Sequence, residues 1–206
     1  MNRLLLKTLR VLLILAVLSA SMTAVSQADT KSYQRTFEKY SMPDVTLVNQ
    51  NGSKVRLKSL LNDSDKTVVV DFIFGTCTTI CPVLSAGYAN LQAKLPAGGP
   101  KIHLVSISID PEKDTPEVLK LYAERFKATD RWLFLTGAKT DIYTLARDGF
   151  KLPIAEPATP GAQIIHSTRL ILIDRTGTVR GFYEATGDTG VRDLVRDIRK
   201  LLEKKP

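Results

Sequence analysis

Hydrophobic positions along the chain change period between strand-like and helix-like segments, and this change predicts an α/β fold. Residues 67–74 and 102–109 are apolar, β-branched runs of strand length. Residues 79–95 carry apolar side chains at helical spacing, and Thr115 followed by Pro116 has the cap and first-turn proline that start a helix. Because strands and helices alternate along the chain, we expect parallel strands at the centre of one sheet.

Shorter patterns predict the remaining elements of the domain. Alternation on both sides of Asn51 and Gly52 predicts an N-terminal β-hairpin. The other expected elements are a helical turn at 59–61, a helix with Val118, Tyr122 and Phe126 on its buried face, strands at 132–135, 170–173 and 179–183, and helices at 139–148 and 191–202. Residues 149–161 hold three prolines and are predicted as the one long irregular segment, a kind of loop that is often functional. The predicted architecture is a single α/β domain with a central mixed sheet flanked by helices.

The first 28 residues have the pattern of a secretory signal peptide. Three positive residues precede the apolar run 11–18, and Ser26-Gln27-Ala28 is a small-x-small cleavage site. The alternative is an uncleaved membrane anchor, for which the apolar run is short against the ~20 residues of a bilayer span. We therefore expect export to the periplasm, a linker at 29–41 and the folded domain at 42–203.

Composition and charge exclude several classes of function. Removal of a leader with three positive and no negative charges lowers the net charge from +8 to +5. No cluster of Lys and Arg is interleaved with aromatic residues, so nucleic acid is not an expected partner. The chain has no glycine-rich phosphate loop, HExxH zinc motif or G-x-S-x-G elbow. Asp110, Glu112 and Asp114 are attributed to the helix start at Thr115 and are not interpreted as a carboxylate dyad.

The only two cysteines lie where the first predicted central strand turns into a helix. Cys77 and Cys81 are four residues apart, so both sulfurs can share one helix face. The partial positive charge of a helix start stabilises a thiolate, and Thr78 or Thr79 would cap that helix. Two such thiolates can form a reversible disulfide or hold a soft metal ion. The alternative is that both cysteines pack as small hydrophobic residues.

The chain has two histidines, and one of them suits the cysteine pair. His103 lies inside an apolar strand and is interpreted as structural. His166 follows the irregular segment and precedes polar Ser167 and Thr168. Two thiolates and one imidazole suit copper or zinc, whereas magnesium and calcium prefer oxygen ligands.

Several motifs resemble the Sco (SenC) family of copper-binding, thioredoxin-like proteins. They are Phe74-Gly75-Thr76-Cys77, Cys81-Pro82, His166-Ser167, the stretch from Ser106 to Pro111, the stretch from Asp114 to Leu119, and Leu172-Ile173-Asp174. The resemblance covers residues 41–202. It implies a thioredoxin-like fold, one copper ion, Cu(I) or Cu(II), bound by Cys77, Cys81 and His166, and a role in building the copper centres of cytochrome c oxidase. The implied partner is the copper-bearing subunit of that oxidase or another copper chaperone, and we expect the protein to be a monomer.

Two other functions use the same cysteines. One is a thiol–disulfide reductase that keeps a partner's cysteines reduced, with Cys77 and Cys81 as the redox pair. The other is a peroxide-linked redox enzyme or sensor, in which Arg169 and Thr76 would assist the reactive cysteine. Only the copper interpretation requires His166. The three residues between the cysteines, and Ser167-Thr168 in place of a proline before the next strand, favour a metallochaperone over an enzyme.

Overall fold

The structure is a computed structural model that describes residues 42–63, 65–75, 81–95, 101–156, 159, 164–185 and 188–203. All of these lie in the unit Ser32–Pro206. The predicted signal peptide, the predicted linker and Cys77 lie outside the described residues. None of the described helices has the length and apolar character that a bilayer crossing requires.

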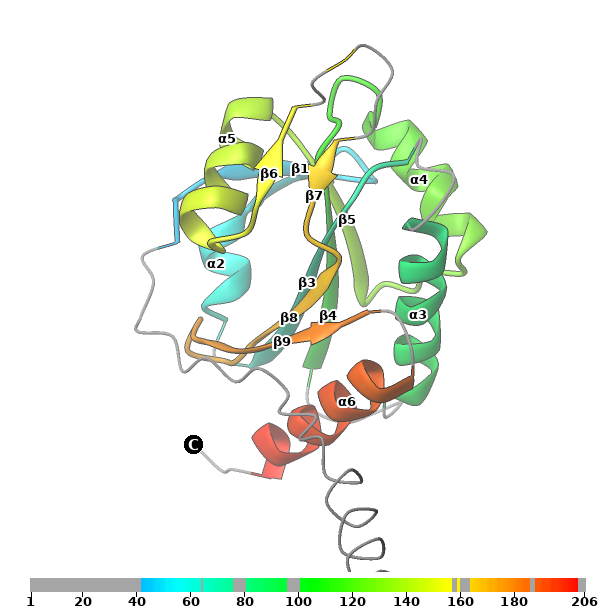
Figure 1. Ribbon diagram of the computed structural model, residues 1–206, viewed down its shortest axis with the longest axis vertical. Coiled ribbons are helices and arrows are strands. Elements are labelled where there is room, and N and C mark those ends of the chain that lie inside the picture. Colours follow the sequence, from blue (N-terminus) through cyan, green and yellow to red (C-terminus); the bar gives the residue numbers. More distant parts are fainter. Residues whose placement is uncertain are drawn as a thin grey trace, which may run out of the picture. The chain divides into compact units, whose positions relative to one another are not determined.

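A seven-stranded mixed sheet forms the centre of the domain (Figure 1). Its strands are β1 Thr46–Asn49, β2 Lys54–Arg56, β3 Lys66–Ile73, β4 Lys101–Ser108, β5 Trp132–Thr136, β8 Arg169–Ile173 and β9 Val179–Glu184. They lie in the order β2-β1-β5-β4-β3-β8-β9. Strands β3, β4 and β5 are parallel, and the outer pairings are antiparallel. The predicted central parallel strands and N-terminal hairpin are therefore confirmed.

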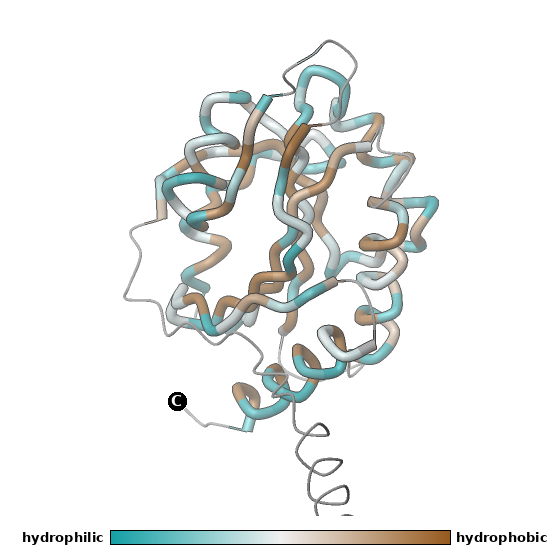
Figure 2. Tube along the Cα trace, viewed as in Figure 1, coloured by the Kyte–Doolittle hydropathy of each residue, from teal (hydrophilic) through white to brown (hydrophobic). Residues whose placement is uncertain are grey.

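Helices cover both faces of this sheet (Figure 1). One face is covered by α2 Leu57–Leu61 and α5 Lys139–Thr144, and the other by α3 Cys81–Lys94, α4 Pro116–Arg125 and α6 Asp188–Glu203. Figure 2 shows the apolar residues concentrated along the central strands. Apolar and polar residues alternate along the helices, so that each helix can bury one side.

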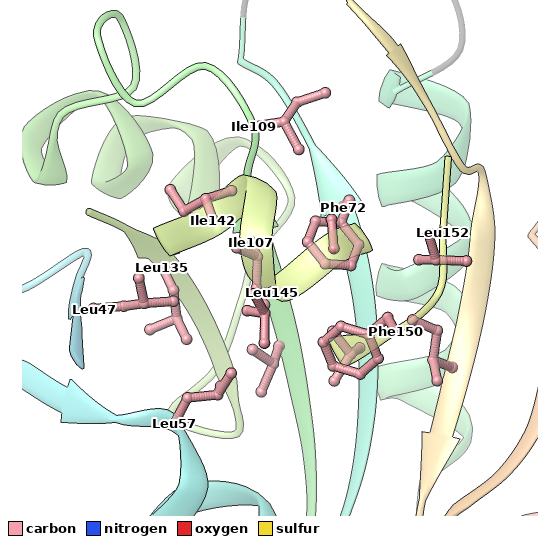
Figure 3. Packing of buried hydrophobic residues seen from close by; sticks show 14 of the residues in the cluster. Leu47, Leu57, Phe72, Ile107, Ile109, Leu135, Ile142, Leu145, Phe150 and Leu152 are labelled. Atoms are coloured by element: carbon pink, nitrogen blue, oxygen red, sulfur yellow. The ribbon is translucent and has the colours of Figure 1, made fainter. Parts of the chain in front are cut away.

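Side chains of β3 alternate between two hydrophobic clusters, one on each face of the sheet. Val70 and Phe72 belong to the cluster under α5, part of which Figure 3 shows, and Val69 and Ile73 belong to the cluster under α3. The ring of Phe72 meets that of Phe150 edge to face, with centroids 5.6 Å apart. This double-sided burial explains why β3 is a continuous apolar run in the sequence.

Asp71 interrupts that run on the α3 side of the sheet, with a side chain that is 1% exposed. Within the described part of the chain neither carboxylate oxygen has a hydrogen-bond partner of good geometry, and the same holds for the hydroxyl of Tyr88 on α3. Burial raises the pKa of Asp71 to about 7, and the nearby hydroxyl of Ser106 opposes this only in part. Burial and the Asp71 carboxylate together raise the pKa of Tyr88. The surroundings of Asp71 therefore favour its protonated, neutral form.

The predicted buried face of α4 is right for Tyr122 and Phe126 and wrong for Val118. Tyr122 is buried and Phe126 packs against the cluster under α3, whereas Val118 is 39% exposed and Leu119 and Ala123 are buried in its place. The predicted set followed i, i+4 and i+8 steps, which drift around a helix, whereas the observed set keeps one face by i, i+3 and i+4 steps. The predicted helix start is confirmed, because the Thr115 side chain accepts a hydrogen bond from the Val118 amide next to Pro116 at the first position.

Two further predictions are corrected after β5. The helix expected over 139–148 is α-helical only to Thr144 and continues as a π-helical turn over Leu145–Gly149. The amide of Phe150 accordingly donates to the carbonyl of Leu145, five residues back. The segment expected to be irregular contains β6 Ile154–Ala155, which pairs with β7 Ile165–His166 in a separate two-stranded sheet.

Candidate metal centre

The fold brings together Cys81 and His166, which are 85 residues apart in the sequence. Cys81 is the first residue of α3, and its side chain is fully buried. His166 is the last residue of β7, and its Nε2 lies 3.9 Å from Cys81 Sγ. Cys77 is not among the described residues, so its place beside this pair stays a prediction.

Hydrogen bonding orients the imidazole of His166 toward the sulfur. Its Nδ1 lies 2.9 Å from the carbonyl oxygen of Ser167. A carbonyl can only accept, so Nδ1 carries the ring proton and the lone pair of Nε2 faces Cys81. The ring of Phe74 packs edge-on against the imidazole, with centroids 5.5 Å apart. A histidine whose second nitrogen is held by a carbonyl has the arrangement usual for metal-ligating histidines.

The neutral form of His166, which a metal ion requires, is favoured by its surroundings. Burial lowers the pKa of His166, and the hydrogen bond to the Ser167 carbonyl opposes this shift in part. The 3.9 Å between Nε2 and Cys81 Sγ is shorter than the sum of a metal–sulfur and a metal–nitrogen bond, about 4.3 Å with zinc bond lengths. A single ion can therefore contact both atoms, and thiolate with imidazole suits copper and zinc.

These two ligands do not complete a site within the described residues. In that part of the chain no three His, Cys, Asp or Glu side chains gather closely enough to hold a metal ion. A second thiolate has one source in the sequence, because Cys77 is the only other cysteine. The donor chemistry therefore fits copper if Cys77 joins Cys81 and His166.

The sequence did not predict that Asp114 would contact the segment before Cys77. The Asp114 side chain is 0% exposed. Its Oδ2 accepts hydrogen bonds from the Gly75 amide at 2.9 Å and from the Ser108 hydroxyl at 2.5 Å. The attribution of Asp114 to the helix start is wrong, since Thr115 itself caps α4. Burial raises the pKa of Asp114, and the two hydrogen bonds oppose this shift.

A match to a known family accompanies this geometry. The model of the SCO1/SenC family matches residues 33–203. The chain belongs to the SCO1/SenC family. The SCO1 protein homolog of Bacillus subtilis (strain 168) is 34% identical over 162 residues, which make up 78% of this chain and 82% of that protein.

Solved structures of SCO1/SenC proteins share the fold as well. One is BsSco, described as a member of the Sco family of cytochrome c oxidase assembly proteins with a disulfide switch. It is 32% identical with a TM-score of 0.70, covering 84% of this chain and 99% of BsSco. Another is Arabidopsis thaliana ScoI with copper bound, 25% identical with a TM-score of 0.65, covering 77% of this chain and 98% of ScoI. The predicted family and thioredoxin-like fold are thus confirmed.

The structure also shows the contacts of two other residues that were weighed in the sequence, His103 and Arg169. His103 pairs with Val68 in the β3–β4 ladder, toward the opposite end of β4 from Ser108, and is half-buried. Arg169 is at the start of β8, and its Nε donates to Glu184 Oε1 at 3.4 Å. The guanidinium proposed to assist a peroxidatic cysteine is therefore engaged by a carboxylate of β9, and Thr76 lies outside the described residues.

Proposed function

We propose that this protein is an exported copper chaperone that binds one copper ion through Cys77, Cys81 and His166 and serves the assembly of the copper centres of cytochrome c oxidase. The observation that carries the proposal is the lone pair of His166 Nε2 directed at Cys81 Sγ, 3.9 Å away. Two comparisons support it: copper is bound in the Arabidopsis ScoI structure, and BsSco is assigned to a family of oxidase assembly proteins.

Each residue has a separate part in holding the ion. Cys81 supplies a thiolate at the start of α3, where the helix dipole favours negative charge. His166 supplies a neutral nitrogen that the Ser167 carbonyl keeps in one tautomer. Cys77 would supply the second thiolate, so the bound cargo is a soft, low-coordinate copper ion. Exchange of ligands with the copper-bearing subunit of the oxidase, or with another copper chaperone, would then pass the ion on.

The location of the protein is part of the same proposal. The pattern of residues 1–28 supports export, with cleavage after Ala28 or retention as an anchor. The linker at 29–41 would then separate the domain at 42–203 from the membrane side. Copper delivery to oxidase subunits outside the cytoplasm needs a domain on that side of the membrane.

Copper retention of the reduced domain, residues 29–206, tests the proposal. After incubation with copper and desalting, the wild-type domain should keep one ion, and Cu(II) should give a thiolate charge-transfer band. His166→Ala should weaken Cu(II) binding far more than Cu(I) binding, because two thiolates alone still suit Cu(I). The matched control His103→Ala should retain both. Loss of all copper from the wild type on desalting would end the chaperone proposal.

A thiol–disulfide reductase is the second candidate, supported by the disulfide switch described for BsSco. In that case exchange with a partner disulfide needs only the thiolates of Cys77 and Cys81. His166→Ala would then change thiol reactivity through the lost imidazole neighbour and leave metal retention unaffected. The same pair of variants therefore separates the two candidates.

A further inference from the structure

We propose that Asp114 is a positioning residue for the Cys77–Cys81 pair, acting through the backbone of Gly75. In its copper part this inference rests on the proposed function, whereas its disulfide part does not. Asp114 precedes α4 by two residues and belongs to the turn after β4, while Gly75 follows β3 and stands two residues before Cys77. The contact between them joins two segments that are 39 residues apart.

The contact is partly buried and belongs to a small hydrogen-bond network. Asp114 Oδ2 accepts from both the Gly75 amide and the Ser108 hydroxyl, and Ser108 Oγ accepts in turn from the Asp110 amide at 3.1 Å. The parallel register sets Ile73 opposite Ser108, so the two strands end side by side where the network begins. The network thus links the segment that follows β3 to the turn that follows β4.

Close packing also supports the contact between Asp114 and Gly75. A Cβ added to Gly75 would lie 2.6 Å from Asp114 Oδ1, closer than such atoms can approach, so the carboxylate packs directly on the glycine backbone. Oδ1 has no hydrogen-bond partner in the described part of the chain, although it is buried. A buried acceptor without a donor is costly. The helix cap does not account for Asp114, because Thr115 performs that task.

Fixing Gly75 limits the positions that Cys77 can reach relative to Cys81. Groups that orient ligands without touching the metal typically change metal affinity about 10–100-fold when removed. A fixed segment also raises the effective concentration of one thiol at the other, which favours the disulfide. Loss of the anchor should therefore weaken both copper binding and disulfide formation.

Asp114→Ala is the main variant, and Asp114→Asn is its conservative partner. Alanine removes both hydrogen bonds, whereas asparagine can keep its amide oxygen where Oδ2 lies and so retain the Gly75 contact. The control Asp174→Ala removes another buried aspartate, which accepts from the Thr176 and Thr178 amides at the far end of β8 from His166. Urea denaturation ranks the variants by stability, so that effects on the site can be compared at equal stability loss.

Two readouts are measured on the domain with each variant. We expect Asp114→Ala to weaken Cu(II) affinity at least about tenfold and Asp114→Asn to recover most of it. We expect the equilibrium constant for disulfide formation in glutathione buffers to fall several-fold in Asp114→Ala and to stay unchanged in Asp174→Ala. Values for folded Asp114→Ala that equal those of Asp174→Ala in both readouts would overturn the proposal.

Hydrogen exchange of the wild type gives a test that needs no variant. The Gly75 amide should exchange as slowly as the amides of β3, because its acceptor is a buried carboxylate. Rapid exchange of this amide would overturn the proposal even if Asp114→Ala failed to fold. If the wild type bound no copper, the proposed function would fail, and the disulfide measurement would still decide the role of Asp114.

Discussion

Replacement of Asp71 by asparagine should stabilise the protein at neutral pH and do so much less in acid. The folded state keeps Asp71 protonated up to its raised pKa of about 7, while the unfolded chain ionises above the ordinary value of 3.8. As pH rises between these two values the unfolded state loses a proton that the folded state keeps, so wild-type stability falls. Above about pH 7 both states are ionised and the loss is complete.

The magnitude follows from the two pKa values. A difference of about 3 units at 1.36 kcal/mol each gives roughly 4 kcal/mol, an upper figure because the Ser106 hydroxyl can adjust toward the charge. Asparagine has nearly the shape of the protonated acid and does not ionise. The stability advantage of Asp71→Asn over the wild type should therefore grow by up to this amount between about pH 4 and pH 7, and stay level above.

Urea denaturation of the reduced, metal-free domain at several pH values measures this advantage. Tyr88, whose pKa depends on Asp71, stays protonated between pH 4 and pH 7 in both proteins, so over this range the difference between them isolates position 71. Asp174→Asn is a control of opposite sign. Burial by itself raises the pKa of Asp174, but hydrogen bonds from Thr176 and Arg180 together outweigh burial and hold this pKa below its usual value. The Asp174 carboxylate stabilises the fold above its unfolded pKa, and this stabilisation is lost as pH falls through its folded pKa. The stability cost of Asp174→Asn should therefore shrink only in strong acid. A difference between Asp71→Asn and wild type that does not change with pH would refute the reasoning.

Three other outcomes are expected from the same structure. Phe72→Ala should cost about 3–5 kcal/mol of unfolding free energy by denaturant titration, since it empties the space facing Phe150, and a cost under about 1 kcal/mol would contradict the packing described. Thr115→Ala should cost about 1 kcal/mol or less, because the cap hydrogen bond to the Val118 amide is long at 3.4 Å; a larger loss would mean that Thr115 does more than cap α4. Mild oxidation should remove two hydrogen atoms and link Cys77 to Cys81 in peptide mass spectra, and two persistent free thiols would count against the redox pair.

The central strands could be predicted from the sequence, and the ligand set stays a prediction that the structure supports in the approach of His166 to Cys81. Strands β3 and β4 are buried on both sides, so each is a continuous apolar run that marks its own position. His166 was predicted as a ligand from donor chemistry, since one imidazole complements two thiolates, and not from any local pattern. The structure then supplied what chemistry could not, namely the tautomer that the Ser167 carbonyl imposes.

Features that depend on distant pairing were not predictable in the same way. Strands β6 and β7 have two residues each, too few for a periodic signal, and they exist because Ile154 pairs with His166. The π-helical turn differs from an α-helix by one extra residue in the hydrogen-bonded turn, and the residue types at 145–149 do not reveal this difference. The contact of Asp114 with Gly75 depends on the register of β3 against β4, which no local pattern encodes.

The candidate ligands are held by two parts of the fold that differ in strength. Cys81 begins a helix packed on the central sheet, and the chain before Cys77 is tied to β4 through Asp114. His166 belongs to a sheet of two short strands, whose other strand, β6, is followed by Glu156 in an ion pair with Lys139 of α5 at 2.7 Å. The His166 side is held in two ways of unequal strength. The small sheet ends in a surface ion pair, which is worth little in water, whereas β7 leads within three residues into β8 of the central sheet and Phe74 packs on the imidazole. If the proposed function holds, loss of the His166 contact alone would leave a dithiolate that still suits Cu(I) but no longer suits Cu(II).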